Sequence, residues 1–422
     1  MVIKDKYSLK EVSDVLNKSM ETLRRWDRAK KLVAHRDLMS NYRYYYLSQL
    51  IQFEEFQNMT NSTAQTKNTI MPKADYQYTV LELFAGAGGL AIGLEKAGLK
   101  CLALNEIDKY AVKTLQVNRP KWNVIPGDIR DISFSEYLDK VDVVTGGFPC
   151  QAFSYAGKRF GFDDARGTLF YEFARTVQET NPKICIGENV KGLQNHDSGR
   201  TLKTMIAILD EIGYRVVDPK VLRAIFYNVP QKRERLILVG IRKDIDIDFE
   251  YPQANKKVYN LRDALKAGPL FDSDVPADSP GTKYPASKKA VLDLVPPGGY
   301  WRDLPLEIQK QYMQKSFFLG GGKTGMARRI SWDEPSLTLT CSPAQKQTER
   351  CHPDHTRPFT VREYARIQTF PDDWEFQGPV SAQYKQIGNA VPVNLAAAIG
   401  GSLVTFLNNV YTEQVVPIAE LV

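Results

Sequence analysis

The residues best suited to covalent chemistry are a cysteine and a glutamate that follow short apolar stretches. Cys150 comes after the apolar run 141–144 and the sequence Gly147-Phe148-Pro149. Glu188 lies near the end of a second apolar run, 184–190. A thiolate can act as a nucleophile, and a carboxyl group can give a proton to the group under attack. The alternative for Cys150 is a buried, inert thiol, the usual state of a free cysteine.

The elements around these residues predict an open α/β sheet. Apolar stretches typical of buried strands cover residues 78–84, 99–105, 124–128, 141–144 and 184–190. A glycine-rich turn, 85–89, follows the first strand and leads into a helix over 90–97 that Gly98 ends. Ligands of such sheets bind at the carboxyl ends of the strands, which is where Cys150 and Glu188 are expected.

The turn and the acids at the strand ends indicate a nucleoside ligand. The glycine spacing departs from the G-x-G-x-x-G pattern that binds a dinucleotide pyrophosphate. Asn105-Glu106 ends the second strand and Asp128 ends the third, and an acid after the second strand can hold ribose hydroxyls. Taken one at a time, each of these glycines and acids is as well explained by a structural role.

The chain from about residue 78 to residue 400 resembles the DNA cytosine-5 methyltransferases. The motifs stand in the family's order: Phe84-Ala85-Gly86-Ala87-Gly88-Gly89, Asn105-Glu106-Ile107, Gly127-Asp128-Ile129, Gly147-Phe148-Pro149-Cys150-Gln151, Glu188-Asn189-Val190, Gln231-Lys232-Arg233-Glu234-Arg235, Glu363 to Pro371, and Gln386 to Pro392. Asn228 stands where glycine is common, and asparagine tolerates positive φ better than most residues.

The resemblance implies a fold, a cofactor and a reaction. The fold is α/β: a Rossmann-like, class I S-adenosylmethionine-dependent methyltransferase domain with a smaller target-recognition domain. In the implied reaction Cys150 adds to carbon 6 of a flipped-out cytosine, Glu188 contacts N3 and the amine, and Arg233 and Arg235 contact O2 and a phosphate. For the two arginines, structural salt bridges are the alternative. The implied S-adenosylmethionine site consists of Phe84, Gly86, Gly88, Glu106, Ile107, Asp128, Ile129, Pro149, Asn389 and Val391.

The stretch between Gly240 and Thr360 lacks these motifs and corresponds to the target-recognition region. Side chains able to contact DNA there and in the arginine motif are Gln231, Thr338, Gln345, Lys346 and Arg350. The alternative is that these side chains are only solvated. Cys341, Cys351, His352 and His355 lack a C-x-x-C pair, so no metal is expected.

The N-terminal fifty residues have a pattern of their own. Ser8 and Glu11 form a capping-box sequence, Ser19 can cap a second helix, and a stretch rich in tyrosine and arginine follows. The segment resembles the winged helix-turn-helix of MerR-type regulators, which implies DNA contacts from Arg24, Arg25 and Arg43. A small protein-interaction domain is the alternative.

We therefore expect the following organisation: a helix-turn-helix over 1–57, a linker over 58–77, the catalytic domain over 78–244 and 357–410, the target-recognition domain over 245–356, and a tail over 411–422. With 43% hydrophobic and 25% charged residues the composition is that of a globular protein, and a net charge of +7 permits a polyanion partner. Five scattered cysteines, no apolar leader and no apolar run of about 18 residues favour a cytoplasmic protein without a membrane segment.

The predicted function is methylation of carbon 5 of cytosine in duplex DNA by a monomeric bacterial enzyme. Such an enzyme protects DNA in a restriction-modification system, whose endonuclease acts on the same site without having to bind the methyltransferase. The N-terminal segment suggests the further hypothesis of autoregulation. Two alternatives remain: an RNA methyltransferase with the same motifs, and a DNA-binding regulator with an inactive domain. Amino-group methyltransferases are disfavoured, because the sequence has no Asp-Pro-Pro-Tyr-like motif.

Overall fold

The computed structural model describes residues 3–37, 40–61, 71–149, 168–319 and 323–415. The chain forms two compact units, each built from segments distant in sequence. The first unit comprises Met1–Thr69, Ala224–Arg233 and Gln253–Asp372. The second comprises Ile70–Arg223, Glu234–Pro252 and Asp373–Val422.

The second unit is built on a seven-stranded sheet in the order β6-β5-β4-β7-β8-β11-β9. Its strands are β4 (Thr79–Leu83), β5 (Lys100–Glu106), β6 (Val124–Pro126), β7 (Val143–Gly146), β8 (Ile184–Val190), β9 (Tyr214–Arg223) and β11 (Glu234–Arg242). The first five strands run parallel to one another, and β11 pairs antiparallel with both β8 and β9. All five strands that the sequence predicts are confirmed, and the antiparallel pair is an addition that it did not predict.

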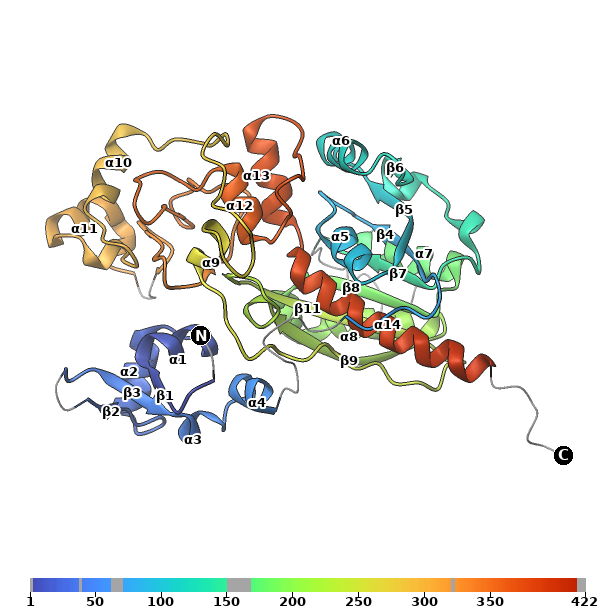
Figure 1. Cartoon of the computed structure of the whole chain (residues 1–422), viewed down its shortest axis with the longest axis horizontal. Coiled ribbons are helices and arrows are strands. Elements are labelled where there is room, and N and C mark those ends of the chain that lie inside the picture. The colour runs from blue at the N-terminus through green and yellow to red at the C-terminus, as the bar shows by residue number, and fades with distance from the viewer. Residues whose placement is uncertain (1–2, 38–39, 62–70, 150–167, 320–322, 416–422) are drawn as a thin grey trace. The chain divides into compact units, whose positions relative to one another are not determined.

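Helices flank this sheet in Figure 1. They are α5 (Gly89–Lys96), α6 (Lys109–Asn118), α7 (Leu169–Thr180), α8 (Arg200–Glu211) and α14 (Val393–Val415). The unit also contains α13 (Val380–Asn389), whose Gln386 accepts a hydrogen bond from Thr114 of α6 at 2.7 Å. The predicted helix after the glycine turn is α5, and Gly98 follows it with a φ of +95°. The long red helix α14 packs on α5 closely enough that a Cβ on Gly93 would meet the backbone nitrogen of Ala397 at 2.6 Å.

The core of the second unit explains why the apolar runs form strands. Leu81, Leu83, Val144 and Cys185 come from three neighbouring strands, and Phe173 comes from α7. All five are fully buried. Alternate residues of β4 point to this side of the sheet, and burial of an apolar side chain stabilises the fold by about 1.5–3 kcal/mol.

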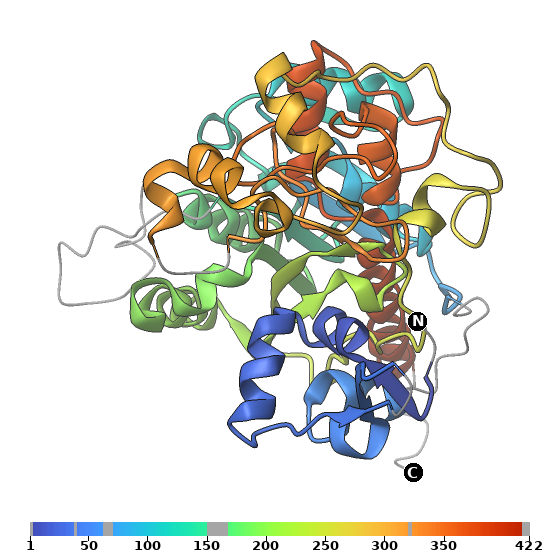
Figure 2. The ribbon, with the colours of Figure 1, turned by 90° about the vertical axis from the view of Figure 1, so that its left-hand side faces the viewer.

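The N-terminal part of the first unit is a small α/β arrangement, drawn in blue in Figure 2. Its elements are β1 (Lys6–Ser8), α1 (Leu9–Leu16), α2 (Met20–Arg28), β2 (His35–Arg36), β3 (Arg43–Tyr46), α3 (Leu47–Leu50) and α4 (Glu54–Asn61). The predicted capping box is confirmed: Ser8 accepts from the Glu11 backbone, and the Glu11 side chain accepts from the Ser8 backbone. Ser19 caps α2 as predicted, and Asn17 between the two helices is left-handed with a φ of 50°.

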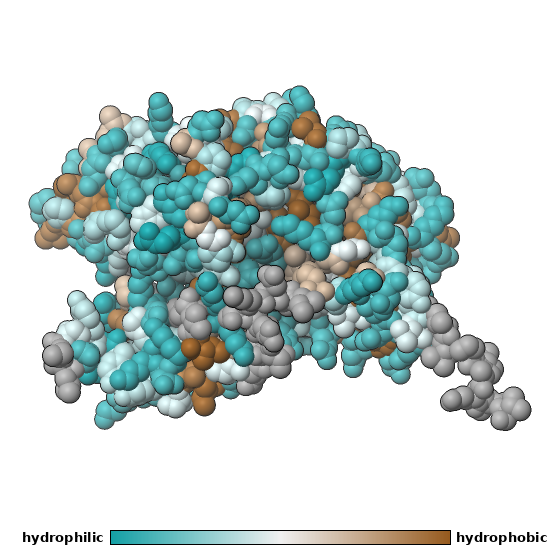
Figure 3. Space-filling view, in the orientation of Figure 1, coloured by the Kyte–Doolittle hydropathy of each residue, from teal (hydrophilic) through white to brown (hydrophobic). Residues whose placement is uncertain are grey.

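The remainder of the first unit consists of short elements around an irregular core. They are β10 (Gln231–Lys232), α9 (Leu261–Leu265), α10 (Ala286–Asp293), α11 (Leu306–Met313), β12 (Ser336–Leu337) and α12 (Val361–Ile367). Trp301, Met313 and Cys351 are among the residues of this core. Apolar residues also gather on the surface at the left of Figure 3. Leu306 at the start of α11, and Phe318 and Leu319 after it, are exposed.

Two expected boundaries differ from the structure. The expected linker over 58–77 begins inside α4, where Met59 is fully buried, and Lys73 and Asp75 bond to Asn408. The expected tail from residue 411 begins inside α14, where the Tyr411 hydroxyl donates to Asp142 at 2.7 Å. The described residues of both segments, 58–61, 71–77 and 411–415, therefore belong to elements or contacts of the fold.

In the part of the chain that the structure describes, one helical stretch, Val380–Glu413, is long and apolar enough to cross a membrane. The 18-residue apolar window within it is 72% buried inside the protein. Its main element, α14, packs against α5, as the core helix of a folded domain does.

Candidate active site

The parallel strands of the second unit bring the motif residues to one edge of the sheet. The carboxyl ends of β4, β5 and β7 are nearly in register, since Leu83 lies opposite Asn105 and Gly146. Gly146 lies opposite Gly187, and β8 continues for three more residues, to Val190. The loops after these strands therefore leave from the same edge. This edge is where ligands bind in open α/β sheets.

The loop after β4 has a backbone suited to a close ligand. Phe84 and Gly86 are left-handed, with φ values of 56° and 55°. A Cβ added to Gly86 would meet no heavy atom within 4 Å, so the space beside this backbone is open. Gly88 is different, because a Cβ there would lie 2.8 Å from the side chain of Leu115. Gly86 thus leaves room for a ligand, whereas Gly88 is required by packing within the protein.

Glu106 at the end of β5 fixes the loop after β4. One carboxylate oxygen accepts the backbone N–H of Gly86 at 2.7 Å, and the other accepts that of Asp108 at 2.7 Å. Each carboxylate oxygen has a second acceptor site, so ribose hydroxyls can still donate to Glu106. Ile107 beside it is 65% exposed, an apolar surface that an adenine ring would cover.

The other expected cofactor residues differ in their exposure and in their partners. Asp128 accepts from the backbone of Arg130 and pairs with its guanidinium, which lowers the pKa of Asp128 to about 2. Ile129 and Val391 are buried, whereas Asn389 is exposed at the end of α13. The open loop, the acceptor carboxylate and the apolar cover fit the adenosine part of S-adenosylmethionine.

The described residues that precede Cys150 are held by Asn189. Its amide nitrogen donates to the carbonyl oxygen of Phe148 at 2.9 Å, while its amide oxygen accepts the Val190 N–H at 2.8 Å. The Phe148 ring packs edge-on against Phe170, with the centroids 5.1 Å apart. Pro149 is the last described residue of this segment, and Cys150 lies outside the described residues.

Glu188 and Arg235 form an ion pair at the same edge of the sheet. Glu188 Oε1 lies 2.5 Å from Arg235 Nε, and both side chains are 11% exposed. The antiparallel pairing of β8 and β11 places Arg235 opposite Val190, two residues from Glu188. A Cβ on Gly147 would lie 3.1 Å from Glu188 Oε2, so the backbone leading to Cys150 passes directly beside the carboxylate.

A buried acid at this edge has no counterpart among the expected site residues. Glu82 lies on β4 opposite Thr145 of β7, and both residues are buried. Burial, and secondarily the charge of Glu106, raise the pKa of Glu82 well above its ordinary value, which favours the protonated carboxyl. The sequence shows that Glu82 stands two residues before Phe84. It does not show that the Glu82 carboxyl is buried.

The other arginine of the motif belongs to the first unit and is buried. Arg233 is 1% exposed and donates to the carbonyl oxygen of Leu339 at 3.2 Å. Gln231 is fully buried as well, and its amide accepts from the Leu339 backbone and donates to Gln368. These contacts connect the arginine motif to the return segment of the chain, where Gln368 had no predicted role.

The expected DNA-contacting residues of the target-recognition region fall into two groups. Gln345 and Lys346 are exposed. Arg350 is buried and donates to the backbone carbonyl oxygen of Thr338. The side-chain hydroxyl of Thr338 in turn donates to the carbonyl oxygen of Lys232. Burial lowers the pKa of Arg350 to about 10. Gln231, Thr338 and Arg350 therefore have protein partners here, and a DNA contact from them stays a prediction.

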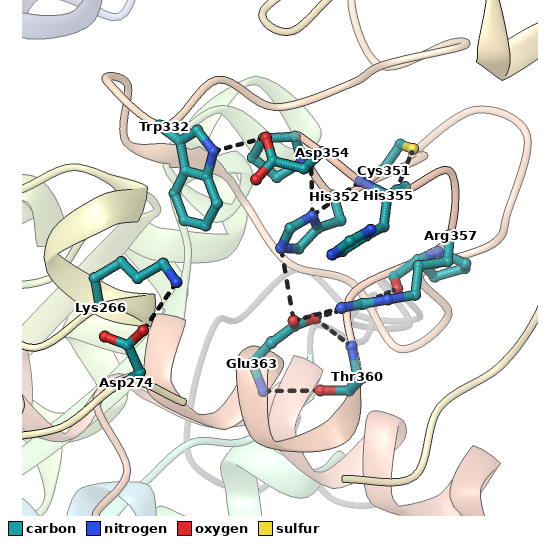
Figure 4. Close-up of polar contacts among 12 residues, drawn as sticks. Lys266, Asp274, Trp332, Cys351, His352, Asp354, His355, Arg357, Thr360 and Glu363 are labelled. Atoms are coloured by element: carbon teal, nitrogen blue, oxygen red, sulfur yellow. Dashed lines mark hydrogen bonds and ion pairs between the residues drawn. The ribbon is translucent and has the colours of Figure 1, made fainter. Parts of the chain in front are cut away.

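The cysteine and histidine cluster near residue 352 has internal partners, shown in Figure 4. His352 Nδ1 accepts the backbone N–H groups of Asp354 and His355, and its Nε2 lies 3.7 Å from Glu363. Burial lowers the pKa of His352 to about 4. Among the described residues no group of three or more histidine, cysteine, aspartate or glutamate side chains is arranged to hold a metal ion.

In the N-terminal segment, two of the three expected arginines have acidic partners. Arg43 lies 2.9 Å from Asp27, and Arg24 lies 3.4 Å from Glu21. Arg25 is exposed on α2. The segment also stacks Trp26 on Phe53, with parallel rings 5.9 Å apart.

The fold and site together define a class of protein. An open sheet whose first strand is followed by an open glycine loop beside an acceptor carboxylate, with a carboxylate–arginine pair at the same edge, has the features of a methyltransferase domain with a nucleoside-type cofactor. Comparison with known sequences gives the family: the profile of the C-5 cytosine-specific DNA methylases matches residues 78–405.

The chain belongs to this family and is a DNA cytosine-5 methyltransferase that uses S-adenosylmethionine. The Type II methyltransferase M.Eco47II of Escherichia coli is 62% identical over 411 residues, which are 97% of this chain and 98% of that protein. M.PspPI of a Psychrobacter strain is 55% identical over 404 residues, 95% of this chain and 96% of that protein. Alignments of this length include most of the N-terminal segment.

A solved structure supports the fold. The crystal structure of a Spodoptera frugiperda DNMT2 mutant matches with a TM-score of 0.55, covering 79% of this chain and 100% of that one. At 17% sequence identity this likeness concerns the fold alone.

Proposed function

We propose that the protein methylates one cytosine in a short duplex DNA sequence and so protects DNA in a restriction-modification system. The relatives named Type II methyltransferases support this proposal, since they align over nearly the whole chain. The observation that carries the chemistry is the Glu188–Arg235 ion pair, against which the backbone leading to Cys150 runs.

In the proposed reaction the Cys150 thiolate adds to carbon 6 of cytosine, and electron density moves to carbon 5. Protonated Glu188 gives its proton to N3, where negative charge develops, and Arg235 stabilises the carboxylate that results. S-adenosylmethionine supplies the methyl group to carbon 5. Loss of the carbon-5 proton to water then returns an electron pair to the ring and expels the thiolate, and the N3 proton returns to Glu188. Because carbon 6 of a paired base is inaccessible to such a pocket, the cytosine must leave the helix.

The test is covalent trapping on duplex DNA that contains 5-fluorocytosine, in the presence of S-adenosylmethionine. Fluorine cannot leave carbon 5 as a proton does, so the wild-type protein should remain bonded to DNA through Cys150. Cys150→Ala should form no such complex. Trapping on transfer RNA but not on DNA would instead establish the RNA alternative, and failure on both substrates would contradict the proposed chemistry.

For the N-terminal segment we propose DNA binding that regulates expression of the methyltransferase itself. Two capped helices, α1 and α2, joined by a short turn and followed by the β2–β3 pair support it, together with the exposed Arg25 on α2. The test is binding to a DNA fragment from upstream of the gene. Arg25→Gln should weaken binding, and the loss should be larger at low salt, because a phosphate contact is removed. Unchanged affinity would contradict this role.

We further propose that the enzyme is cytoplasmic and acts as a monomer on DNA, with its endonuclease sharing the recognition site without binding it. Size-exclusion chromatography with light scattering, in the absence and presence of the endonuclease, tests the monomeric state and the absence of a complex with the endonuclease. A dimer or a co-eluting endonuclease would contradict them.

A further inference from the structure

An ion pair within the first unit joins the N-terminal segment to the arginine motif. Asp14 lies on α1, and Lys232 is the second residue of β10. Lys232 Nζ lies 2.5 Å from Asp14 Oδ1, although 218 positions separate the two residues. The side chains are only 6% and 11% exposed, so the pair is largely withdrawn from solvent.

Because the pair is buried, the charge of Asp14 and the charge of Lys232 stabilise each other. Burial raises the pKa of Asp14, and the ammonium group of Lys232 opposes that shift. Glu334 and Lys10 also act on the charge of Asp14, Glu334 raising its pKa and Lys10 lowering it. Glu334 is bound by both of its oxygens to Arg328, at 2.6 Å each. Removing one member of a buried ion pair leaves an uncompensated charge, which is far more costly than removing both.

Lys232 stands between two residues of the catalytic motif, and their backbone is fixed by neighbouring contacts. The Lys232 carbonyl accepts from Thr338, and Gln231 is bonded to Leu339 and Gln368. The Arg233 carbonyl accepts from the backbone of Ala224 at 2.8 Å. These contacts hold the main chain of β10, and Asp14 holds the side chain that projects from it.

We propose that Asp14 is a positioning residue for methyl transfer: by binding Lys232 it holds β10, and with it Arg233, in the arrangement that the reaction requires. The N-terminal segment then supports catalysis in addition to any contact that it makes with DNA. The inference rests on the proposed function, because it concerns the rate of that same reaction. It also predicts that Lys232 is held by protein and does not serve as a phosphate contact.

The experiment measures kcat and KM for methyl incorporation into one unmethylated plasmid, with the full-length chain. The variants are Asp14→Asn, Lys232→Met and the double variant. Lys4→Gln is the matched control, because it removes an ion pair between Lys4 and Glu11 of α1 that is more exposed and does not involve β10. Thermal unfolding is recorded for every variant, and kinetics are measured well below the lowest midpoint.

We expect Lys232→Met to lower kcat by about tenfold, since small displacements in a catalytic arrangement have effects of this size or larger. Asp14→Asn should lower kcat by a smaller factor, because the ammonium group left behind is closer to solvent. The double variant should recover to within about threefold of wild type, since no unpaired charge remains. KM for S-adenosylmethionine should stay constant, and Lys4→Gln should behave as wild type.

Two results would overturn the proposal. If Asp14→Asn lowers only the unfolding midpoint and leaves kcat unchanged, the pair is structural. If Lys232→Met is impaired and the double variant is equally impaired, Lys232 acts on DNA directly. Methyl incorporation by the wild-type protein tests the proposed function separately, so a failure there is distinguished from a failure of the role of Asp14.

Discussion

Replacing Asn189 with alanine is the sharpest test of how the nucleophile loop is positioned. The Asn189 amide nitrogen donates to the Phe148 carbonyl oxygen at 2.9 Å, two residues before Cys150. Phe148 is buried, so water cannot readily replace this donor. The second bond of Asn189, to the backbone N–H of Val190, is easier to replace because Val190 is 46% exposed.

The expected size of the effect of Asn189→Ala follows from the Phe148 carbonyl oxygen, which loses its donor. A buried carbonyl that loses its donor is destabilised by about 1–3 kcal/mol. A displaced arrangement of residues 147–149 that exposes the carbonyl to water avoids this cost, so the equilibrium shifts toward it by the same energy. The population with the native loop then falls by about 5- to about 150-fold, at 1.4 kcal/mol per factor of ten. We expect kcat to fall by a factor in this range, while KM for S-adenosylmethionine changes little.

The assay is single-turnover methyl transfer to duplex DNA with enzyme in excess, which reports the chemical step. Asn181→Ala is the control: Asn181 precedes β8, at the end opposite Glu188, and it donates to Asp139. That change should lower the unfolding midpoint without slowing the chemical step. The reasoning is refuted if Asn189→Ala loses as much stability as the control and transfers methyl groups at the wild-type rate.

The remaining predictions concern charge, space and pH. Glu188→Gln should lower kcat by about 100-fold or more in steady-state assays, because N3 loses its acid, and near-wild-type kcat would exclude that role. Gly86→Ala should weaken S-adenosylmethionine binding by about tenfold in calorimetry, because its Cβ enters the open space beside the loop, and should lower stability by about 1–2 kcal/mol, because alanine is strained at a φ of 55°. Gly93→Ala should cost about 1–3 kcal/mol in urea unfolding because α5 and α14 cannot separate, and an unchanged midpoint would contradict the close packing. The pKa of His352 is lowered from 6.5 to about 4, chiefly by burial, so the unfolded chain binds more protons in that window. Stability should therefore fall by up to about 3 kcal/mol as pH falls from 6.5 to 4, and His352→Asn should flatten this dependence in urea titrations at pH 7 and pH 5.

The sequence by itself determined the five parallel strands of the sheet and the order of the motifs along the chain. Apolar runs such as 141–144 and 184–190 have the length and composition of buried parallel strands, and glycine at 86 and 98 permits the left-handed turns that follow. At Asn228 the sequence left the backbone conformation open, and the structure shows it left-handed with a φ of 56°. These features are local, because residue type and spacing within about ten positions decide them.

Only the tertiary structure decided which motif residues meet one another. Arg235 reaches Glu188 because β11 pairs antiparallel with β8, and Lys232 reaches Asp14 across 218 positions. Gln231 and Arg350 have side chains suited to DNA, yet both are buried among protein partners. Pairing of distant segments depends on the packing of the whole unit, and a polar side chain in a sequence does not show whether water, DNA or another part of the chain will satisfy it.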